Sequence, residues 1–482
     1  MIELDVTAWL LIDATLLLYW LAVVVLIVSE DRNPTAALAW LLVLIALPVV
    51  GLLVYFFFGR NWPAITQRSP KTRRVREVVG RFMPGVYERY RPQSEAFTGG
   101  LQRPWVRRNA RLIQQKVATP PLPVRTCDVY GTGEEYFDVL LADLAGAQRF
   151  VHLSYFIWKR DALTARITEV LLDRLAAGVE VRILNDYVGC FRHPKDELER
   201  LAAAGAVVRA DVTGLARLNY RNHRKITVVD AEIGHTGGFN VAQEYIDGGK
   251  RFPAWRDTGL RITGPGVADL EKLFDVRWLE AHGENLFDAR YYPDPTLPAG
   301  DIMVQTVHQG YDDPWNSVTR SYQVAIAGAR ERVQLQSPYF VPDQTTLDVL
   351  INAAAGGVRV DLMTTLWLDK KLPWWAAESF FEPFLAAGGR LWQWEKGFFH
   401  AKSLTVDGAA CAIGTLNLDI RSLRINKELM VWVYDPVVVA RHEQLFLDDL
   451  RDCRELTLDE VRAWSRGRRM RNSASRLVSN LL

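Results

Sequence analysis

The feature that most constrains this chain is a motif that occurs twice with the same internal spacing. The pattern His-x-Lys-x4-Asp begins at His223 and begins again at His400. Each copy is followed, at matching distances, by a glycine and an asparagine: Gly237 and Asn240 in the first copy, Gly414 and Asn417 in the second. Five positions in one shared register are hard to obtain by chance, so the sequence predicts two copies of one structural unit.

The secondary-structure pattern around the two motifs is also duplicated. We predict strand, helix and strand at 150–157, 163–177 and 179–184 in the first half, and at 333–341, 346–355 and 358–363 in the second. The expected fold class is α/β, with two pseudosymmetric halves of mixed sheets flanked by helices that share one active site. We place these halves at 125–300 and 301–482, after a transmembrane hairpin at 1–60 and a basic juxtamembrane linker at 61–124.

The hairpin is predicted from two apolar runs, 8–28 and 35–58, each long enough to cross a bilayer as a helix. A cleaved signal peptide fits the first run poorly, because Glu3 and Asp5 precede it and a second run follows. We interpret Asp13, inside the first run, as a carboxylate near headgroup depth. The turn has only Arg32, whereas six basic residues follow the second run: Arg60, Arg68, Lys71, Arg73, Arg74 and Arg76. The expected location is therefore the inner cell membrane, as a multi-pass protein with the catalytic halves in the cytoplasm.

Composition narrows the function classes. The net charge is only +2, which does not indicate nucleic acid as the partner. The four cysteines are scattered, without a Cys-x2-Cys pair, so neither zinc nor a disulfide framework is expected.

The doubled motif provides the inventory needed for phosphodiester chemistry without a metal or another cofactor. Lys225 and Lys402 would neutralise nonbridging oxygens, and Asn240 and Asn417 would donate hydrogen bonds to them. One histidine would attack phosphorus while the other protonates the leaving oxygen. A single histidine on a strand is more often a packed or surface residue, and the duplication is what favours the catalytic interpretation.

These motifs resemble the phospholipase D superfamily and, within it, the bacterial cardiolipin synthases. Further matching stretches are 221–225, 237–240, 255–258, 337–343, 414–422 and 476–482. The resemblance implies a phosphohistidine intermediate, with His223 as nucleophile and His400 as acid, and with Asp230 and Asp407 among the motif residues but mainly structural. It also implies that Glu428 orients a catalytic histidine and that Asp257 is its counterpart in the first half; a surface salt bridge is the alternative for both.

The resemblance further implies a hydroxyl contact from Thr415 to the substrate phosphate. Gly238 occupies the corresponding place in the first half, so that contact is expected to be lost there.

Three features favour a lipid substrate: the hairpin, an aromatic segment at 367–399 and a basic C-terminal segment (Arg466, Arg468, Arg469, Arg471 and Arg476). A buried core helix and a solvated tail are the respective alternatives for the last two. The expected activity is transfer of a phosphatidyl group between two phosphatidylglycerol molecules, with anionic membrane lipids as partners. A membrane-tethered phosphodiesterase, acting as lipid hydrolase or nuclease, and a noncatalytic lipid-binding scaffold are the rival hypotheses. The sequence leaves the oligomeric state open, a homodimer included.

Overall fold

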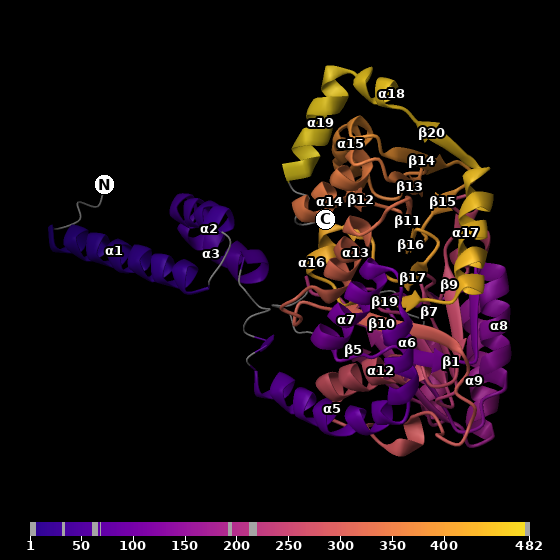
Figure 1. The fold of residues 1–482 in the computed structure, drawn as a ribbon. Helices are drawn as coiled ribbons and strands as arrows, with labels where there is room; N and C mark the ends of the chain where they lie inside the picture. The colour runs from indigo at the N-terminus through magenta and orange to yellow at the C-terminus, as the bar shows by residue number, and fades with distance from the viewer. Residues whose placement is uncertain are drawn as a thin grey trace.

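A computed structural model of the chain describes residues 6–30, 34–59, 66–67, 69–190, 195–211 and 219–477. Its centre consists of two sheets with helices on both sides, and the N-terminal helices extend away from this body (Figure 1). Within the described residues the first half forms a seven-stranded sheet in the order β2-β9-β7-β6-β3-β4-β5. The strands are β2 Thr126–Tyr130, β3 Phe150–Tyr155, β4 Glu180–Asp186, β5 Val207–Asp211, β6 Ile226–Val229, β7 Ile233–Gly237 and β9 Gly259–Thr263.

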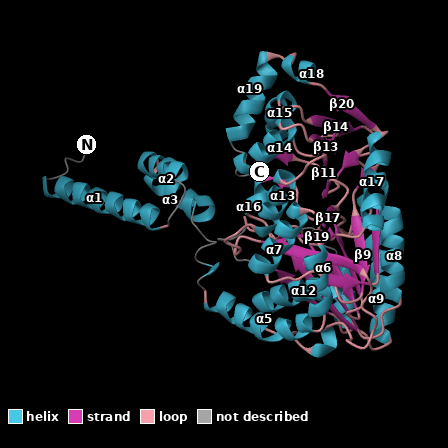
Figure 2. Ribbon diagram, viewed as in Figure 1, coloured by secondary structure: helices cyan, strands magenta, loops and turns pink. Residues whose placement is uncertain are grey.

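Helices cover both faces of this first sheet (Figure 2). On one face, Val151 and Leu153 of β3 pack with α8 (Gly133–Ala145) and α9 (Ala162–Ala176). On the other face, α12 (Val267–His282) packs against Phe150 and Val228. Alternation of side chains along each strand accounts for this two-sided burial, which is typical of near-continuous apolar strands. The remaining helices of this half are α10 Lys195–Ala203, α11 Glu244–Asp247 and η3 Ala289–Tyr291.

The second half repeats this topology in a nine-stranded sheet, counted over the described ranges. Its order is β1-β10-β19-β17-β16-β11-β13-β14-β20, and the seven strands between the two edges correspond in sequence and in direction to those of the first sheet. The duplicated α/β fold is therefore confirmed. The strands are β1 Leu122–Val124, β10 Ile302–Gln309, β11 Arg332–Gln336, β13 Arg359–Thr365, β14 Arg390–Trp394, β16 Ser403–Val406, β17 Ala410–Gly414, β19 Glu428–Val433 and β20 Cys453–Leu456.

Local signals position the equivalent helices of the two halves. Asp161 caps α9 through the amide of Thr164, and Asp343 caps α14 (Gln344–Ala355) through the amide of Thr346. Gly178 and Gly357 follow these helices with positive φ, which glycine adopts without strain. The other helices of this half are α13 Ser317–Ala327, α15 Lys371–Ala386, α16 Ile420–Arg424, α17 Pro436–Leu450, α18 Leu458–Arg462 and α19 Arg466–Leu477.

The two halves meet along a seam that is itself pseudosymmetric. On one side, β8 (Trp255–Arg256) pairs in parallel with β15 (Phe398–Phe399), and the His400 amide donates to the Arg256 carbonyl at 2.7 Å. On the other side, Asn222 and Lys427 form an isolated parallel β-bridge, and the His223 amide donates to the Lys427 carbonyl at 3.0 Å. Each motif histidine is thus fixed by backbone of the opposite half. A separate short ladder joins β12 (Phe340–Val341) to β18 (Leu418–Asp419).

The N-terminal region differs from the predicted hairpin. Helix α1 (Val6–Ser29) is continuous, and Trp9–Ser29 is the one helix in the described chain that is long and apolar enough to cross a membrane. The second apolar run breaks at Leu47, before Pro48, into α2 (Pro34–Ala46), α3 (Pro48–Val54) and a π-helical turn, η1 (Tyr55–Gly59). Asp13 lies exposed on α1. Arg32, Arg60 and Arg68, on which part of the orientation argument rests, lie outside the described residues.

The predicted linker is folded. Helices α5 (Pro70–Glu88), α6 (Arg91–Gly100) and α7 (Pro104–Val117) follow one another, and β1 joins the edge of the second sheet. Val75 and Met83 of α5 are buried in a cluster that joins α12 of the first half to β17 and β19 of the second, whereas Trp105 and Ile113 of α7 are buried in the core of the second half. This segment therefore braces both halves.

Candidate active site

A cleft of about 490 Å³ lies at the seam and contains groups from both motif copies. His223 and Asn240 line it from the first half, and His400 and Asn417 line it from the second. The two halves therefore build one joint site, as the duplication predicted.

The two histidines are oriented by carboxylates of the opposite half. His223 Nδ1 lies 3.0 Å from Glu428 Oε2, and His400 Nδ1 lies 2.5 Å from Asp257 Oδ2. Both carboxylates are fully buried. A carboxylate at Nδ1 fixes the tautomer and leaves Nε2 for the cleft, which is the arrangement that a nucleophile and a proton donor both need. This geometry agrees with the predicted orienting role of Asp257 and Glu428. The sequence did not predict that each acid contacts the histidine of the opposite half.

Strand register shows that Asp257 and Glu428 are equivalent positions. Gly237 pairs with Gly259 across β7 and β9, and Gly414 pairs with Met430 across β17 and β19. Asp257 lies two residues before Gly259, and Glu428 lies two residues before Met430.

Electrostatics divides the site into neutral bases and charged acids. Burial lowers the pKa of His400 to about 4 and also depresses the pKa of His223, although Glu428 opposes the shift at His223. Burial would raise the pKa of Glu428, but His223 and Lys225 outweigh it and hold that pKa below its ordinary value. Lys402 and His400 do the same for the pKa of Asp257. Near neutral pH the two imidazoles are therefore neutral and the two carboxylates are charged.

The motif lysines lie behind the histidines rather than among the side chains that line the cleft. Lys225 Nζ donates to the carbonyl of His223 at 2.6 Å, and Lys402 Nζ makes the same contact to the carbonyl of His400. Burial lowers the pKa of Lys225 to about 7 and that of Lys402 to about 8. Both charges are close enough to depress the pKa of the histidines, so they are positioned to favour a bound phosphate electrostatically.

The motif aspartates anchor loops and do not reach the cleft. Asp230 accepts hydrogen bonds from the amides of Gln148, Arg149 and Phe150 at 2.7, 2.7 and 2.8 Å. Asp407 does the same for the amides of residues 330–332. Both residues have positive φ, 55° and 53°. These contacts agree with the mainly structural role that the resemblance implied, and they give no support to grouping the two aspartates with the catalytic residues of the motif.

The asparagines differ from each other. Asn240 Oδ1 accepts from the Ile157 amide at 3.0 Å, and its Nδ2 is hydrogen-bonded to the Tyr245 hydroxyl, so its amide is largely committed to holding the loop. Asn417 has a buried Oδ1 without a hydrogen-bond partner in the described chain. This oxygen is an acceptor and cannot donate to a phosphate, and the Asn417 side chain is also hydrogen-bonded to Asp419. Phosphate contacts from both asparagines therefore stay predictions.

Thr415 does not face the cleft, and the predicted phosphate contact is corrected. Its hydroxyl donates to Glu428 and accepts from the Leu429 amide at 3.0 Å. In the first half, a Cβ on Gly238 would lie 1.8 Å from Asp257 Oδ1. The shorter aspartate thus occupies the space in which the second half places its threonine side chain. The glycine–threonine difference therefore follows from the aspartate–glutamate difference.

Sequence reasoning gave no individual role to the aromatic and cationic groups around the histidines, although several lie in stretches that it singled out. The rings of Tyr245, Trp255 and Phe398 surround His400 at centroid distances of 5.8, 5.3 and 5.6 Å, and Phe156 lies 5.0 Å from His223. Five cations also line the cleft: Lys159, Arg221, Arg251, Lys370 and Arg421. Arg221 lies two residues before His223 and Arg421 four residues after Asn417, and this closeness to the motifs is the signal that could have identified these two arginines.

The aromatic and basic segments are mostly structural. Phe380, Phe381 and Phe384 of α15 are buried in the core of the second half, so the core-helix alternative holds for them. Trp367 and Leu372, near the cleft, remain exposed. In α19, Arg468 and Arg471 both pair with the buried Glu378, at 2.5 and 2.8 Å, and so are held against α15. Residues 478–482 of the predicted match lie outside the described chain.

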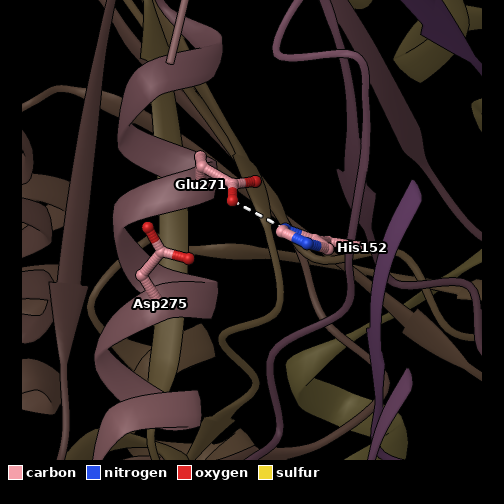
Figure 3. Close-up of side chains that lie close together, drawn as sticks. All are labelled: His152, Glu271 and Asp275. Atoms are coloured by element: carbon pink, nitrogen blue, oxygen red, sulfur yellow. Dashed lines mark hydrogen bonds and ion pairs between the residues drawn. The ribbon is translucent and has the colours of Figure 1, made fainter. Parts of the chain in front are cut away.

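Within the described residues, His152, Glu271 and Asp275 form a cluster of side chains of the types that bind metals, and none of the three lines the cleft (Figure 3). Glu271 and Asp275 project from successive turns of α12 toward His152 of β3, with His152 Nδ1 2.7 Å from Glu271 Oε1. Burial raises the pKa of Glu271 to about 8 and the pKa of Asp275 well above its usual value, and it lowers the pKa of His152 to about 3. At neutral pH these shifts leave His152 and the two acids without charge, so the cluster can be buried at low cost. The hydrogen bond between His152 and Glu271 then holds α12 against the sheet.

The site and the duplicated sheet define a phospholipase D-like protein. The model described as "Cardiolipin synthase, PLD-like domain" matches residues 140–275 and 322–450, and that described as "Phospholipase_D-nuclease N-terminal" matches residues 17–60. The cardiolipin synthase of Geobacillus kaustophilus is 34% identical, with 95% of this chain and 91% of the relative covered. The major cardiolipin synthase of Bacillus subtilis is 31% identical, with 98% and 99% covered.

The chain belongs to the cardiolipin synthase family. Among solved structures, the phosphatidylserine synthase of Haemophilus influenzae has a TM-score of 0.61 at 15% identity, covering 77% of this chain and 99% of that one. This likeness shows the shared fold.

Proposed function

We propose that the protein is a cardiolipin synthase, a phosphatidyltransferase that acts on two phosphatidylglycerol molecules. The observation that carries the proposal is the pair of histidines in one cleft, each with Nδ1 against a buried carboxylate. Full-length similarity to cardiolipin synthases supports transfer over hydrolysis or nuclease activity.

In the first step, His223 Nε2 attacks phosphorus and the bond from phosphorus to the glycerol oxygen breaks. The glycerol oxygen takes a proton from His400 Nε2. Before this transfer, Asp257 stabilises the imidazolium form of His400. The anionic phosphodiester favours the charged form of His400, which offsets the low pKa that burial gives this group. Lys225 and Lys402 supply further positive charge near the phosphate.

In the second step, a headgroup hydroxyl of another phosphatidylglycerol attacks the phosphohistidine. His400 takes the hydroxyl proton, the phosphorus–nitrogen bond breaks, and His223 is regenerated. The net change is two phosphatidylglycerols to one cardiolipin and one glycerol. The aromatic groups around His400 support lipid alcohol over water as acceptor, because they limit solvent at the reacting bond.

The experiment is incubation of the purified full-length chain with phosphatidylglycerol in mixed micelles, with and without a chelator. Cardiolipin and glycerol in equal amounts would support the proposal. Phosphatidic acid as the main product would favour the hydrolase, and cleavage of DNA or RNA the nuclease. Product formation that persists in His223→Ala and His400→Ala variants would favour the scaffold and refute the mechanism.

The membrane arrangement is part of the proposal. The apolar α1 supports membrane association, and the basic residues after the apolar region support catalytic halves on the cytoplasmic side of a multi-pass inner-membrane protein. Labelling of single cysteines on either side of the membrane in intact cells tests this. We further propose anionic lipids as partners and leave the homodimer to be tested by light scattering in detergent.

A further inference from the structure

A second cavity, of about 570 Å³, lies on the opposite side of the seam from the catalytic cleft. The two spaces have no lining residue in common. The seam strands alternate between them: His223 and Asn426 line the cleft, whereas Arg224 and Lys427 line the cavity. Successive side chains of an extended chain point to opposite sides, so the catalytic motif itself separates the two spaces.

Most of the cavity wall is apolar. Helix α5 contributes Val75, Val79 and Met83, and α12 contributes Leu273 and Val276. The volume is in the range of small-molecule sites. A wall of this kind favours hydrocarbon over solvent.

The seam side of the cavity carries a buried cation that makes no direct ion pair within the described residues. Arg224 is 4% exposed; its guanidinium donates to the carbonyls of Glu428 and Gln309, at 3.2 and 2.9 Å, and its third contact is with His308 Nδ1 at 3.5 Å. No ion pair in the described part of the chain includes Arg224. Burial lowers the pKa of this guanidinium to about 10, and the group remains charged at neutral pH. Asp312 and Glu280, which also line the cavity, oppose this lowering of the pKa, but neither makes an ion pair with the guanidinium. A buried charge without a direct ion pair is costly, and an anionic ligand in contact with it would compensate that cost.

The neighbouring cations are already balanced, which makes Arg224 distinct. Lys427 pairs with Glu280 and Asp312 at 3.1 and 2.8 Å. Lys272 pairs with Asp269 at 3.0 Å.

The rim of the cavity has the composition of a lipid–water boundary. Lys116 Nζ lies 3.8 Å over the ring of Trp315, which is 44% exposed, and Arg76 of α5 is also exposed at the rim. Tryptophan and basic side chains together favour the headgroup region of a membrane. Helix α5 is also the first long helix after the apolar N-terminal helices in the chain.

We propose that this cavity is a second binding site, separate from catalysis, for an anionic phospholipid. Its phosphate lies against Arg224, and an acyl chain lies along the wall formed by α5 and α12. The occupant would sit directly behind His223, because Arg224 follows it in the chain and donates to the backbone of Glu428. Free inorganic phosphate has the same headgroup chemistry without the chain, and the experiment distinguishes the two.

The test uses the full-length chain in detergent with His223→Ala and His400→Ala, so that the probe is not consumed. The probe is phosphatidylglycerol with a photoreactive acyl chain, and cross-linked peptides are mapped by mass spectrometry. Labelling of residues 70–88 and 267–282 is expected. Unlabelled phosphatidylglycerol should compete, whereas phosphatidylcholine and inorganic phosphate should not.

Two glycines of α5 provide a matched pair of variants. A Cβ on Gly80 or on Gly85 meets nothing within 4 Å, but only Gly80 lines this cavity. Gly80→Trp should occlude the cavity and reduce labelling by about fivefold or more, and Gly85→Trp should leave it unchanged. Labelling of peptides that contain Trp255 and Phe398 reports an intact catalytic cleft in every sample.

The proposal is overturned by absence of label from both helices, by equal labelling of Gly80→Trp, by protection with inorganic phosphate alone, or by equal competition from phosphatidylcholine. None of these results depends on turnover, so they do not bear on the proposed reaction.

Discussion

Replacing Gly238 by alanine should disable one histidine selectively. The new Cβ would lie 1.8 Å from Asp257 Oδ1, and ordinary contact begins near 3.4 Å, so the carboxylate must retreat by about 1.6 Å. Asp257 is hydrogen-bonded to His400 Nδ1 at 2.5 Å, and a retreat of that size breaks the contact. A hydrogen bond to a charged group contributes about 1.5 to 3 kcal/mol, which corresponds to a loss of roughly 10- to 100-fold in kcat.

The assay compares two donors. If His400 protonates the leaving group, a phosphatidyl ester of p-nitrophenol, whose leaving group needs no proton, should lose much less activity than phosphatidylglycerol in its first step. Single-turnover formation of the phosphohistidine measures that step directly. Thr415→Val provides the contrast, because it removes the hydroxyl that holds Glu428 against His223 and should slow both donors alike. Thr415→Ser keeps the hydroxyl and should stay near the parent.

Two results would refute this reasoning. One is Gly238→Ala activity within about twofold of the parent, given the 1.5 kcal/mol lower bound. The other is an equal loss on both donors in a variant with unchanged thermal unfolding, which would show that His400 is not the acid.

Three further predictions concern charge. First, kcat/KM should fall as pH rises through about 7 to 8, because the ammonium groups of Lys225 and Lys402, whose pKa values are about 7 and 8, lose their charge; a flat profile to pH 9 would contradict this. Second, the pKa of Glu271 is raised from 4.5 to about 8, so its stabilising contribution is present below pH 4.5 and is lost as pH rises through about 8. At pH 9 the free energy of unfolding of Glu271→Gln should therefore exceed that of the parent by on the order of a few kcal/mol, seen as a higher unfolding temperature, and an advantage confined to pH 5 would sink the idea. Third, Asp407→Ala should cost about 3 kcal/mol of stability by leaving backbone amides of residues 330–332 unpaired, measured by denaturant unfolding in micelles, with kcat of the folded fraction preserved; a large drop in that kcat would place Asp407 in catalysis.

Much of the fold could be predicted because the same local sequence patterns occur in both halves. The strands before each motif and the glycines after the helices recur in both halves, and each half tests the other. The break at Leu47 also had a signal, since Pro48 interrupts the second apolar run. A count of apolar residues alone overlooked it.

The pairing between halves could not be predicted from local patterns. That Glu428 serves His223 and Asp257 serves His400 depends on how the seam brings opposite backbones together. The hydroxyl of Thr415 looked like a phosphate ligand because its partner, Glu428, is adjacent only across β17 and β19. Arg468 and Arg471 looked like free charges because Glu378 is distant in sequence.

The crossed contacts have a consequence for how such a protein could arise. Each half lacks the acid that its own histidine requires, since that acid belongs to the other half. A chain comprising a single half would be inert alone and could work only when two copies exchanged carboxylates reciprocally. Joining the two copies in one polypeptide removes the need for that encounter, and it leaves each acid free to change independently, as the aspartate and glutamate here have done.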